Sequence, residues 1–265
     1  VDAVQKLALK TSGCLRQEVD FSHITMGIKC GASDTTSGLA SNPVVGYVAD
    51  KIVDNGGTVI FGETPEFIGA EHILKRRART PEIAADIDRI VMEMENRAKS
   101  LGVDMRTGQP TPGNIKGGLS SIEEKSLGAI VKSGTKPIEG VLKYTERPVG
   151  KGLWIKDTPG REIEVLTGMA IGGAQIMLFS TGRGAPQGFP TVPVIKICGN
   201  PITYERMEND MDINAGRIIT GKRSLEEVGE ETFDKMIRVL SGEHTKGEEI
   251  KYTRSMDIYT LGPII

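Results

Sequence analysis

Five short apolar runs along the chain each end in a cluster of glycine and polar side chains. The runs are Ile24–Lys29, Thr58–Phe61, Leu153–Lys156, Gln175–Phe179 and Val192–Ile197. The clusters that follow them are Cys30–Gly38, Gly62–Glu66, Asp157–Gly160, Ser180–Gly184 and Cys198–Asn200. Short apolar runs bounded by turn residues are typical of buried strands.

Segments with helical periodicity alternate with these strands. They are predicted at Pro43–Val53, Glu66–Arg79, from Thr80 to about Leu101, Ser121–Ser133, Pro201–Asn209 and Leu225–Leu240. Alternating strands and helices predict an α/β fold, with a mostly parallel, Rossmann-like sheet covered by helices on both faces. Ligands of such sheets bind beyond the carboxyl ends of the strands. We therefore expect the five polar clusters to form one site.

The longest irregular stretch, residues 102–119, contains seven Gly and Pro residues and also carries Asn114 and Lys116. A long loop within a compact domain is usually functional or disordered. We interpret residues 1–265 as a single α/β domain with a long loop excursion.

The composition excludes several classes of function. The formal net charge is −2, from 33 basic and 35 acidic residues, so bulk charge favours neither nucleic acid nor a membrane surface as partner. The three cysteines do not suggest a disulfide framework. The sequence contains neither an apolar run long enough for a transmembrane helix nor a signal-peptide pattern, so we expect a cytoplasmic protein.

The loop Cys30–Gly38 consists of small and polar residues before a predicted helix. Backbone N–H groups in such a loop, together with the helix N-terminus, favour an anionic ligand. The alternative is a simple helix cap by Ser33 or Asp34. The loop matches neither G-x-G-x-x-G nor the Walker A motif, so nucleotide binding has little support.

The segment Glu63–His72 brings together three carboxylates and an imidazole, which suit a divalent metal. Glu63 is interpreted as functional. For Glu66, a site role and a helix-dipole role both remain open. His72 adjoins Glu71 on a predicted helix, so the two side chains diverge, and a surface or packing role remains open for His72.

The loop Ser180–Gly184 is a second candidate anion site, because the Arg183 guanidinium can bind a carboxylate with two hydrogen bonds. A solvated surface turn is the alternative.

The segment Asp210–Gly216 alternates like a cation loop but lacks the full EF-hand pattern. No G-x-S-x-G elbow and no paired-cysteine zinc motif is present.

Taken in order, several blocks closely resemble the C-terminal part of the altronate and galactarate dehydratase family, which sulfolactate sulfo-lyase large subunits share. The blocks are Gly27–Gly38, Asn42–Pro43, Glu63–His72, Pro112–Gly118, Glu123–Gly128, Asp157–Gly160, Ser180–Gly184 and Asp210–Gly216. The resemblance runs from about residue 24 to about residue 248. It departs from the family at Cys30-Gly-Ala, where Cys-Gly-Gly is expected, and in the C-terminal tail.

The resemblance implies a metal-dependent lyase that removes water from a sugar acid and leaves a 2-keto-3-deoxy acid, with Fe²⁺ or Mn²⁺ as the metal. Longer members carry a preceding segment and a small histidine-bearing N-terminal domain or separate subunit. The chain begins at Val1 without Met, so we expect it to be a fragment or a large subunit. The expected partners are a small hydroxy acid, the histidine-bearing part and further copies of the chain.

Elimination of water needs a base for the proton beside the carboxylate, an acid or metal for the leaving hydroxide, and donors for the developing enolate. Lys125 or Lys116 is the candidate base or enolate stabiliser, and Glu63 is a further catalytic candidate. The predicted metal ligands are Glu63, Glu66 and Asp34. The predicted substrate-binding residues are Cys30, Ser33, Asp34, Ser37, Asn42, Asn114, Thr181 and Arg183.

Two other functions remain open. One is cleavage of a carbon–sulfur bond in a sulfonated hydroxy acid, because N–H groups and Arg bind sulfonate as well as carboxylate. The other is a non-catalytic subunit that binds sugar acids.

Overall fold

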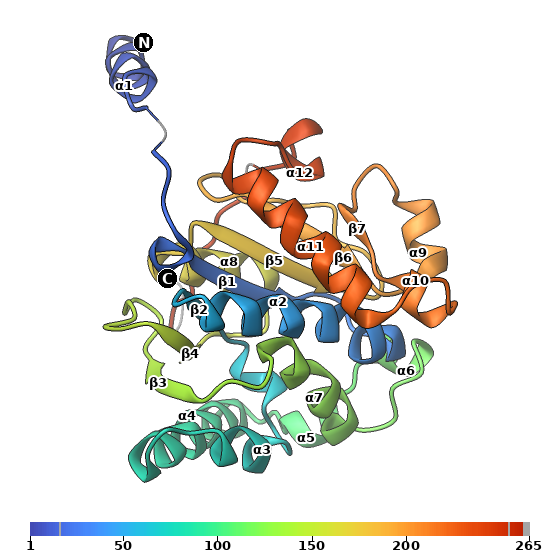
Figure 1. The fold of residues 1–265 in the computed structure, drawn as a ribbon. Coiled ribbons are helices and arrows are strands. Elements are labelled where there is room, and N and C mark those ends of the chain that lie inside the picture. Colours follow the sequence, from blue (N-terminus) through green and yellow to red (C-terminus); the bar gives the residue numbers. More distant parts are fainter. Residues whose placement is uncertain (16, 254, 262–265) are drawn as a thin grey trace.

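A seven-stranded sheet forms the centre of the protein (Figure 1). The computed structural model describes residues 1–15, 17–253 and 255–261. Within these residues all strand pairs are parallel, and the strand order is β3-β4-β2-β1-β5-β6-β7. The strands are β1 Thr25–Cys30, β2 Thr58–Phe61, β3 Ile138–Leu142, β4 Gly152–Lys156, β5 Ile176–Thr181, β6 Val194–Cys198 and β7 Ile213–Asn214.

The five predicted strands are confirmed as β1, β2, β4, β5 and β6, with ends that differ by at most two residues. The sequence analysis missed β3 and β7. Strand β3 lies at the sheet edge, where its burial alternates and Glu139 and Gly140 interrupt the apolar run. Strand β7 has only two residues, which is too short for a periodic pattern.

The α-helices are α1 Asp2–Ser12, α2 Asn42–Asp54, α3 Glu71–Arg76, α4 Pro81–Ser100, α5 Met105–Gly108, α6 Pro112–Lys116, α7 Ile122–Ile130, α8 Glu162–Ile171, α9 Pro201–Arg206, α10 Gly216–Ile219, α11 Leu225–Leu240 and α12 Lys246–Glu249. Thr80 and Ser121 cap α4 and α7, because their side chains accept hydrogen bonds from the backbone N–H groups of Ile83 and Glu124.

Two helix predictions need correction. The stretch predicted as one helix, Glu66–Arg79, contains a short 3-10 helix at Thr64–Glu66 and then α3. Gly69, with φ 87°, separates the two because a left-handed residue cannot continue a helix. The stretch 102–119 is not wholly irregular, since it contains α5 and the capped helix α6.

Alternate residues of the central strands pack into two cores, one on each face of the sheet. One core joins strand residues such as Ile28 and Leu178 to residues of α2 and α11. The other joins Met177 and Phe179 to residues of α8. Figure 1 shows α2 and α11 in front of the sheet and α8 behind it. The predicted α/β fold with helices on both faces is therefore confirmed.

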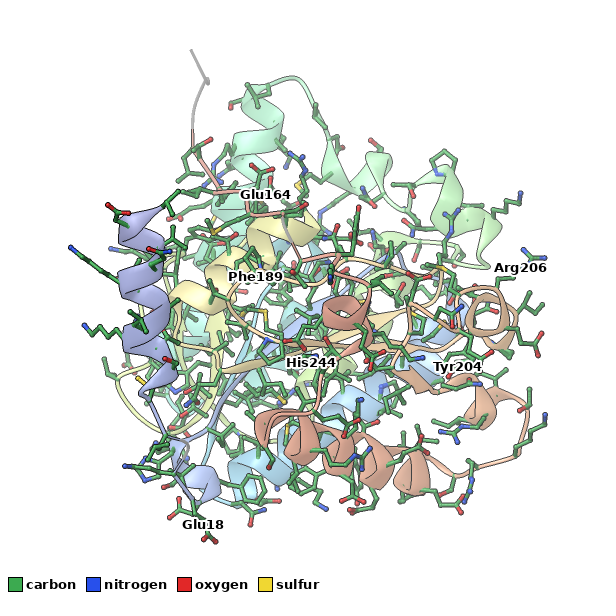
Figure 2. The ribbon with its side chains drawn as sticks, turned by 90° about the horizontal axis from the view of Figure 1, so that it is seen from above. Glu18, Glu164, Phe189, Tyr204, Arg206 and His244 are labelled. Carbon is green, nitrogen blue, oxygen red and sulfur yellow. The ribbon has the colours of Figure 1, made fainter. Side chains whose placement is uncertain are left out.

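The outer helices differ in how they attach to this centre. Helix α1 projects away from the sheet, and none of its residues is buried (Figure 1). Seen from above, Tyr204 and Arg206 project from α9 at the edge of the molecule, and His244 lies on the connection between α11 and α12 (Figure 2). No helix within the described residues is long and apolar enough to cross a membrane.

Candidate functional site

The carboxyl ends of the five predicted strands lie beside one another, as the sequence analysis expected. In the register of the sheet, Phe61 of β2 pairs with Ile155 of β4, and Cys30 of β1 pairs with Ser180 of β5. Strand β1 has β2 on one side and β5 on the other. The chain continues from β1 to β2 on one side of β1, and from β5 to β6 on the other side. A topological switch point therefore lies between β1 and β5, and α/β proteins bind ligands at such points.

A cavity of about 250 Å³ opens at this edge of the sheet. Its lining combines strand ends with the region of α6, α7 and the start of α8. The lining residues are Lys29, Cys30, Gly31, Ala32, Ser33, Glu66, Thr111, Asn114, Lys125, Gly160, Glu162 and Arg183. Six of the residues predicted from the sequence are among them: Cys30, Ser33, Glu66, Asn114, Lys125 and Arg183. We call this space the edge cavity.

A buried array of alternating charges lies against the edge cavity. Lys29 Nζ contacts Glu63 Oε1 at 2.5 Å, and Lys132 Nζ contacts Glu63 Oε2 at 2.5 Å and Glu66 Oε2 at 2.6 Å. The backbone N–H of Cys30 also donates to Glu63 Oε2, at 2.7 Å. The four side chains carry two positive and two negative charges, so the array is neutral as a whole. We call these four residues the charge array.

The backbone around Glu63 is shaped to aim its carboxylate into the array. Glu63 has φ 74° and ψ 61°, a left-handed conformation that is uncommon for a residue with a Cβ and is often found at functional sites. Its N–H donates to Thr158 Oγ1 at 2.7 Å. Gly62 is required before it, because a Cβ there would lie 2.6 Å from Thr158 Oγ1 and 2.8 Å from the Lys156 carbonyl.

Lys132 reaches the array from a 3-10 helix, Val131–Ser133, that follows α7. Arg77 fixes this turn from α3, since its guanidinium donates to Ser133 Oγ at 2.9 Å and to the Ser133 carbonyl at 3.1 Å. Because Arg77 holds the last residue of this 3-10 helix, the turn can carry the fully buried ammonium group of Lys132 to a defined position.

The array controls the protonation of its own members. Burial alone would lower the pKa of Lys29 and of Lys132, but Glu63 and Glu66 outweigh it and raise both. Burial and the charge of Glu66 raise the pKa of Glu63. Burial also acts to raise the pKa of Glu66, but Lys132 and Lys29 outweigh it and lower this pKa. Both lysines are therefore cations at neutral pH, and a proton added to the array goes to Glu63 first.

Cys30 contributes a buried thiol to the wall of the edge cavity. Its Sγ lies 3.6 Å from Ser33 Oγ. Burial, followed by the charge of Glu66, raises the pKa of this thiol. Because only a thiolate is a strong nucleophile, Cys30 is poorly suited to covalent catalysis and better suited to shaping the cavity.

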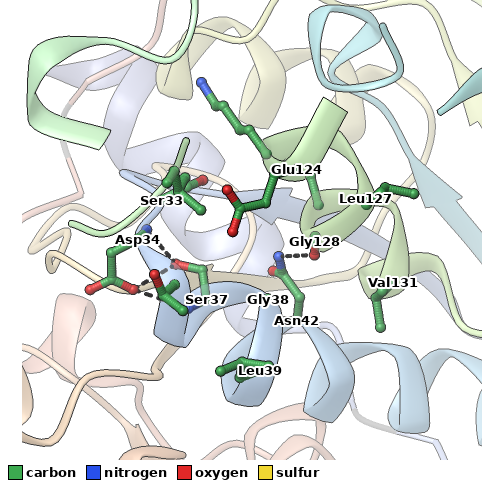
Figure 3. A pocket seen from close by; sticks show the side chains of 14 residues that line it. Ser33, Asp34, Ser37, Gly38, Leu39, Asn42, Glu124, Leu127, Gly128 and Val131 are labelled. Carbon is green, nitrogen blue, oxygen red and sulfur yellow. Dashed lines mark hydrogen bonds between the residues drawn. The ribbon is translucent and has the colours of Figure 1, made fainter. Parts of the chain in front are cut away.

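The loop predicted to bind an anion is held together by its own side chains (Figure 3). Asp34 Oδ1 accepts hydrogen bonds from Thr36 Oγ1 at 2.6 Å and from the Ser37 N–H at 3.0 Å. Asp34 Oδ2 accepts one from Asn200 Nδ2 at 3.0 Å. Asp34 and Ser37 therefore brace the loop, and neither lines the edge cavity, whereas Ser33 does.

Asn42 and Thr181 also connect structural elements. Asn42 Nδ2 donates to the Gly128 carbonyl at 2.8 Å, and its Oδ1 accepts from Ser180 Oγ at 2.5 Å. Thr181 Oγ1 accepts from the Gly184 N–H at 3.0 Å and so closes the turn that carries Arg183. Neither residue lines the edge cavity, but Asn42 lines the second cavity described below.

Lys125 and Asn114 lie together at the cavity wall. Lys125 Nζ donates to Gln109 Oε1 at 2.8 Å and to Asn114 Oδ1 at 3.4 Å, and Asn114 Nδ2 donates to the Ser33 carbonyl at 2.9 Å. Lys116, the other candidate base, ends α6 with an exposed side chain outside the edge cavity. Of the two predicted lysines, the structure therefore brings only Lys125 to the site.

Arg183 has an exposed side chain that lies across Gly113 of α6. A Cβ at position 113 would collide with Arg183 Nη1, so glycine there leaves room for the guanidinium. The predicted placement of Arg183 beside a candidate ligand site agrees with its position in the cavity wall.

A second cavity, of about 260 Å³, adjoins the edge cavity (Figure 3). The two share Ser33 and Lys125. Leu39, Leu127 and Val131 give its rim an exposed apolar character.

The three predicted metal ligands do not meet at one point, because Glu63 and Glu66 both contact Lys132 Nζ and Asp34 does not. Both oxygens of Glu63 face ammonium groups, one oxygen of Glu66 does so too, and Asp34 is bonded within its own loop. Across the described part of the chain, no group of three His, Cys, Asp or Glu side chains could hold a metal ion. These residues as arranged do not fit a divalent ion, and Fe²⁺ or Mn²⁺ dependence stays a prediction.

The remaining motifs lie away from the edge cavity. The chain's three histidines, His23, His72 and His244, all have exposed side chains. In the segment Asp210–Gly216, Asp212 accepts hydrogen bonds from the backbone N–H groups of Lys196 and Lys246, both at 2.8 Å. These hydrogen bonds join β6 to α12, so Asp212 has a structural role.

Lys29 and Lys132 were missed by the sequence analysis. A signal for Lys29 was present, since a lysine within a strand buried on both faces needs buried hydrogen-bond acceptors, which a carboxylate can provide. Lys132 gave no comparable signal, because charged residues near the end of a helix are common and usually solvated.

A family model described as D-galactarate/altronate dehydratase, C-terminal, matches residues 21–263. The galactarate dehydratase (L-threo-forming) of Escherichia coli is 40% identical over 86% of this chain and 43% of its own length. The (2R)-sulfolactate sulfo-lyase subunit beta of Chromohalobacter salexigens is 38% identical over 89% of this chain and 61% of its own length. The altronate dehydratase of Bacillus subtilis is 36% identical, with corresponding shares of 89% and 47%. This chain therefore spans about half the length of these relatives.

Proposed function

Because this chain belongs to the family of D-galactarate/altronate dehydratase C-terminal regions, we propose that its edge cavity is the site of a lyase that removes water from a sugar acid. The product would be a 2-keto-3-deoxy acid. The observation that carries the proposal is that Lys29, Lys125 and Arg183 all line one cavity at the switch point of the sheet. A small anionic hydroxy acid suits such a cavity.

The substrate carboxylate is assigned to the side of the cavity that carries Arg183. A guanidinium can bind a carboxylate through two parallel hydrogen bonds. Ser33 lies on the same wall and provides a hydroxyl group. Binding here would fix which carbon atoms of the acid face the interior of the cavity.

Lys125 is assigned as the base: its neutral amine takes the proton beside the carboxylate and becomes an ammonium group. It lines the edge cavity, whereas Lys116 does not. Gln109 and Asn114 each accept a hydrogen bond from Lys125 Nζ, which orients the lone pair of the amine. Glu66 also lines the cavity and is assigned to accept a hydrogen bond from a substrate hydroxyl.

Dependence on Fe²⁺ or Mn²⁺ is part of the proposal, and the assay described below measures it. The donor set of the described residues does not support a metal centre at Glu63. No step is therefore assigned to a metal here, and the ligands of such an ion would have to include groups outside this set.

Cleavage of a carbon–sulfur bond is the second candidate function. It is favoured by the 38% identity to a protein named as a (2R)-sulfolactate sulfo-lyase subunit. A sulfonate is an anion that Arg and Lys side chains bind through the same hydrogen bonds as a carboxylate.

An anaerobic assay with the purified chain tests these proposals. Galactarate, altronate and sulfolactate are supplied with Fe²⁺, with Mn²⁺ or with a chelator, and keto acid and sulfite are both measured. Keto acid without sulfite supports dehydration, and sulfite favours the second candidate. A rate that the chelator leaves unchanged would contradict metal dependence.

A second arm adds a small histidine-bearing region taken from a longer relative. Keto acid formed only with this addition would support the chain as one part of a divided site. The absence of keto acid and sulfite in both arms, with no binding of any of the three acids, would refute the proposed function. Arg183→Ala is the matched variant, and its KM is expected to rise at least tenfold while the chain stays folded.

A further inference from the structure

The charge array contains two lysines, but only one of them faces the edge cavity. Lys29 is part of the cavity wall, whereas Lys132 and Glu63 are not. The side chain of Lys132 is fully buried. The array thus has a front, formed by Lys29 and Glu66, and a back, formed by Glu63 and Lys132.

We propose that Lys29 is the cation that contacts the oxygen leaving the substrate, and that Glu63 and Lys132 are its positioning residues. The inference rests on the proposed function, because it assigns a role within the same elimination. It adds a catalytic residue that the sequence analysis did not identify. A fixed cation beside a developing negative charge is among the largest contributions that an active site makes.

The hydrogen bonds of Lys29 leave part of its ammonium group available. An ammonium group has three N–H donors. Two are directed at the Cys30 carbonyl and at Glu63 Oε1. The next acceptor, the Gly160 carbonyl, is 3.5 Å away and belongs to the cavity wall, so this contact is weak. A substrate oxygen in the cavity can take this third donor.

Packing fixes the direction of the Lys29 side chain. Lys29 Nζ lies 5.4 Å from the centre of the Phe179 ring, which pairs with it in the sheet. Glu63 holds the ammonium group from behind, and Lys132 and the Cys30 N–H hold Glu63 in turn. Because all of these groups are buried, the cation is fixed before substrate arrives and needs little reorganisation during the reaction.

Another strand lysine provides a matched control. Lys196 of β6 lies in the same row of the sheet as Lys29, with Phe179 between them. It is equally buried, but its Nζ donates to the Pro186 carbonyl and it does not line the edge cavity. Loss of Lys196 therefore tests the effect of removing a buried lysine without removing the proposed cation.

Turnover of the sugar acid and its rescue by an added amine test the proposal. Lys29→Ala should lower kcat about 100-fold, the typical effect of losing one such donor. Ethylammonium added to the assay should restore kcat at least tenfold, because the vacated space opens into the cavity. Lys132→Ala should not be rescued, since its site is sealed, and Lys196→Ala should keep the kcat of the unaltered chain.

Lys29→Ala leaves the array with one excess negative charge and could fail to fold. Lys29→Ala/Glu63→Gln restores neutrality and should show the same loss of kcat. Retention of kcat within threefold in either folded variant would overturn the proposal, as would equal rescue of Lys29→Ala and Lys132→Ala.

A binding measurement separates the inference from the proposed function. If the unaltered chain binds galactarate without turnover, calorimetry should show binding at least tenfold weaker for Lys29→Ala, and unchanged affinity would overturn the role of Lys29. If the unaltered chain neither binds nor converts any of the three acids, the proposed function fails and the inference fails with it. If the unaltered chain converts a sugar acid and Lys29→Ala converts it at the same rate, only the inference is refuted.

Discussion

Lys132→Met gives the sharpest test of the charge array. Lys132 Nζ lies within 2.6 Å of carboxylate oxygens of both Glu63 and Glu66, and its side chain is fully buried. After the substitution, Glu63 keeps Lys29 as a partner, but Glu66 loses its only direct ion pair within the array. Methionine fills a similar volume, so the change is chiefly one of charge.

The expected cost follows from the unpaired charge. Removing one partner of a buried ion pair typically destabilises a protein by about 3–5 kcal/mol. Because globular proteins are stable by about 5–15 kcal/mol, the variant should still fold with a much lower urea midpoint. In Lys132→Met/Glu66→Gln the remaining pair, Lys29 and Glu63, is balanced, so we expect this double variant to regain about 2–3 kcal/mol.

Urea unfolding followed by circular dichroism measures these differences. Lys75→Met is the matched control, since Lys75 pairs with Asp88 at the surface and its loss should cost less than about 1 kcal/mol. The reasoning would be refuted if Lys132→Met cost no more than this control. It would also be refuted if the effects of the two array substitutions simply added.

The pH dependence supplies an independent check with a defined sign. Lys132 and Lys29 lower the pKa of Glu66 in the folded chain, so this carboxylate adds stability above its unfolded pKa and loses it as pH falls through the folded value. In Lys132→Met the buried carboxylate costs stability when ionised, and protonation relieves the cost. The difference between the two proteins should therefore shrink as pH is lowered from 7 towards 4.

Three further predictions concern other positions. Burial lowers the pKa of Lys156 to about 8, from 10.5, so the unfolded chain binds more protons between these values and the fold gains stability as pH rises from 8 to 10. Lys156→Met should lack this gain, as the pH dependence of its thermal midpoint will show. Gly182→Ala would drive a Cβ into the Asp34 carboxylate and should cost about 1–3 kcal/mol, whereas Gly108→Ala, with open space around it, should cost less than 0.5 kcal/mol by urea unfolding. Arg183→Ala should raise KM at least tenfold with a smaller effect on kcat, and an unchanged KM in steady-state assays would contradict its role in carboxylate binding.

Much of the fold was predictable because buried parallel strands have a strong local signature. Strands β1, β2, β4, β5 and β6 are apolar on both faces and end at glycine or polar residues, so their positions could be read directly from the sequence. Burial alternates along edge strand β3, and Glu139 and Gly140 interrupt its apolar run, so its sequence resembles a loop. Strands that are buried on both faces were therefore found, whereas the edge strand β3, which is buried on one face only, was missed.

The candidate site was predictable only in part, because sequence order shows which residues reach the sheet edge but not which way they face. Asp34 and Ser33 are neighbours in one loop, yet Ser33 lines the edge cavity and Asp34 braces the loop through Asn200, 166 residues away. Residue type alone suggested both as ligand-binding groups. Only the hydrogen-bond partners, which come from distant segments, separate the two roles.

The charge array shows why acidic clusters are easily assigned to metals. Two glutamates three residues apart after a strand suggest a cation, and the site does contain cations, in the form of Lys29 and Lys132. These lysines come from β1 and from the end of α7, 34 and 69 residues away from Glu63 in the sequence. Carboxylates indicate that positive charge is needed nearby, but its source depends on packing. A lysine in a two-sided buried strand is therefore a clue that should be weighed before a metal is assigned.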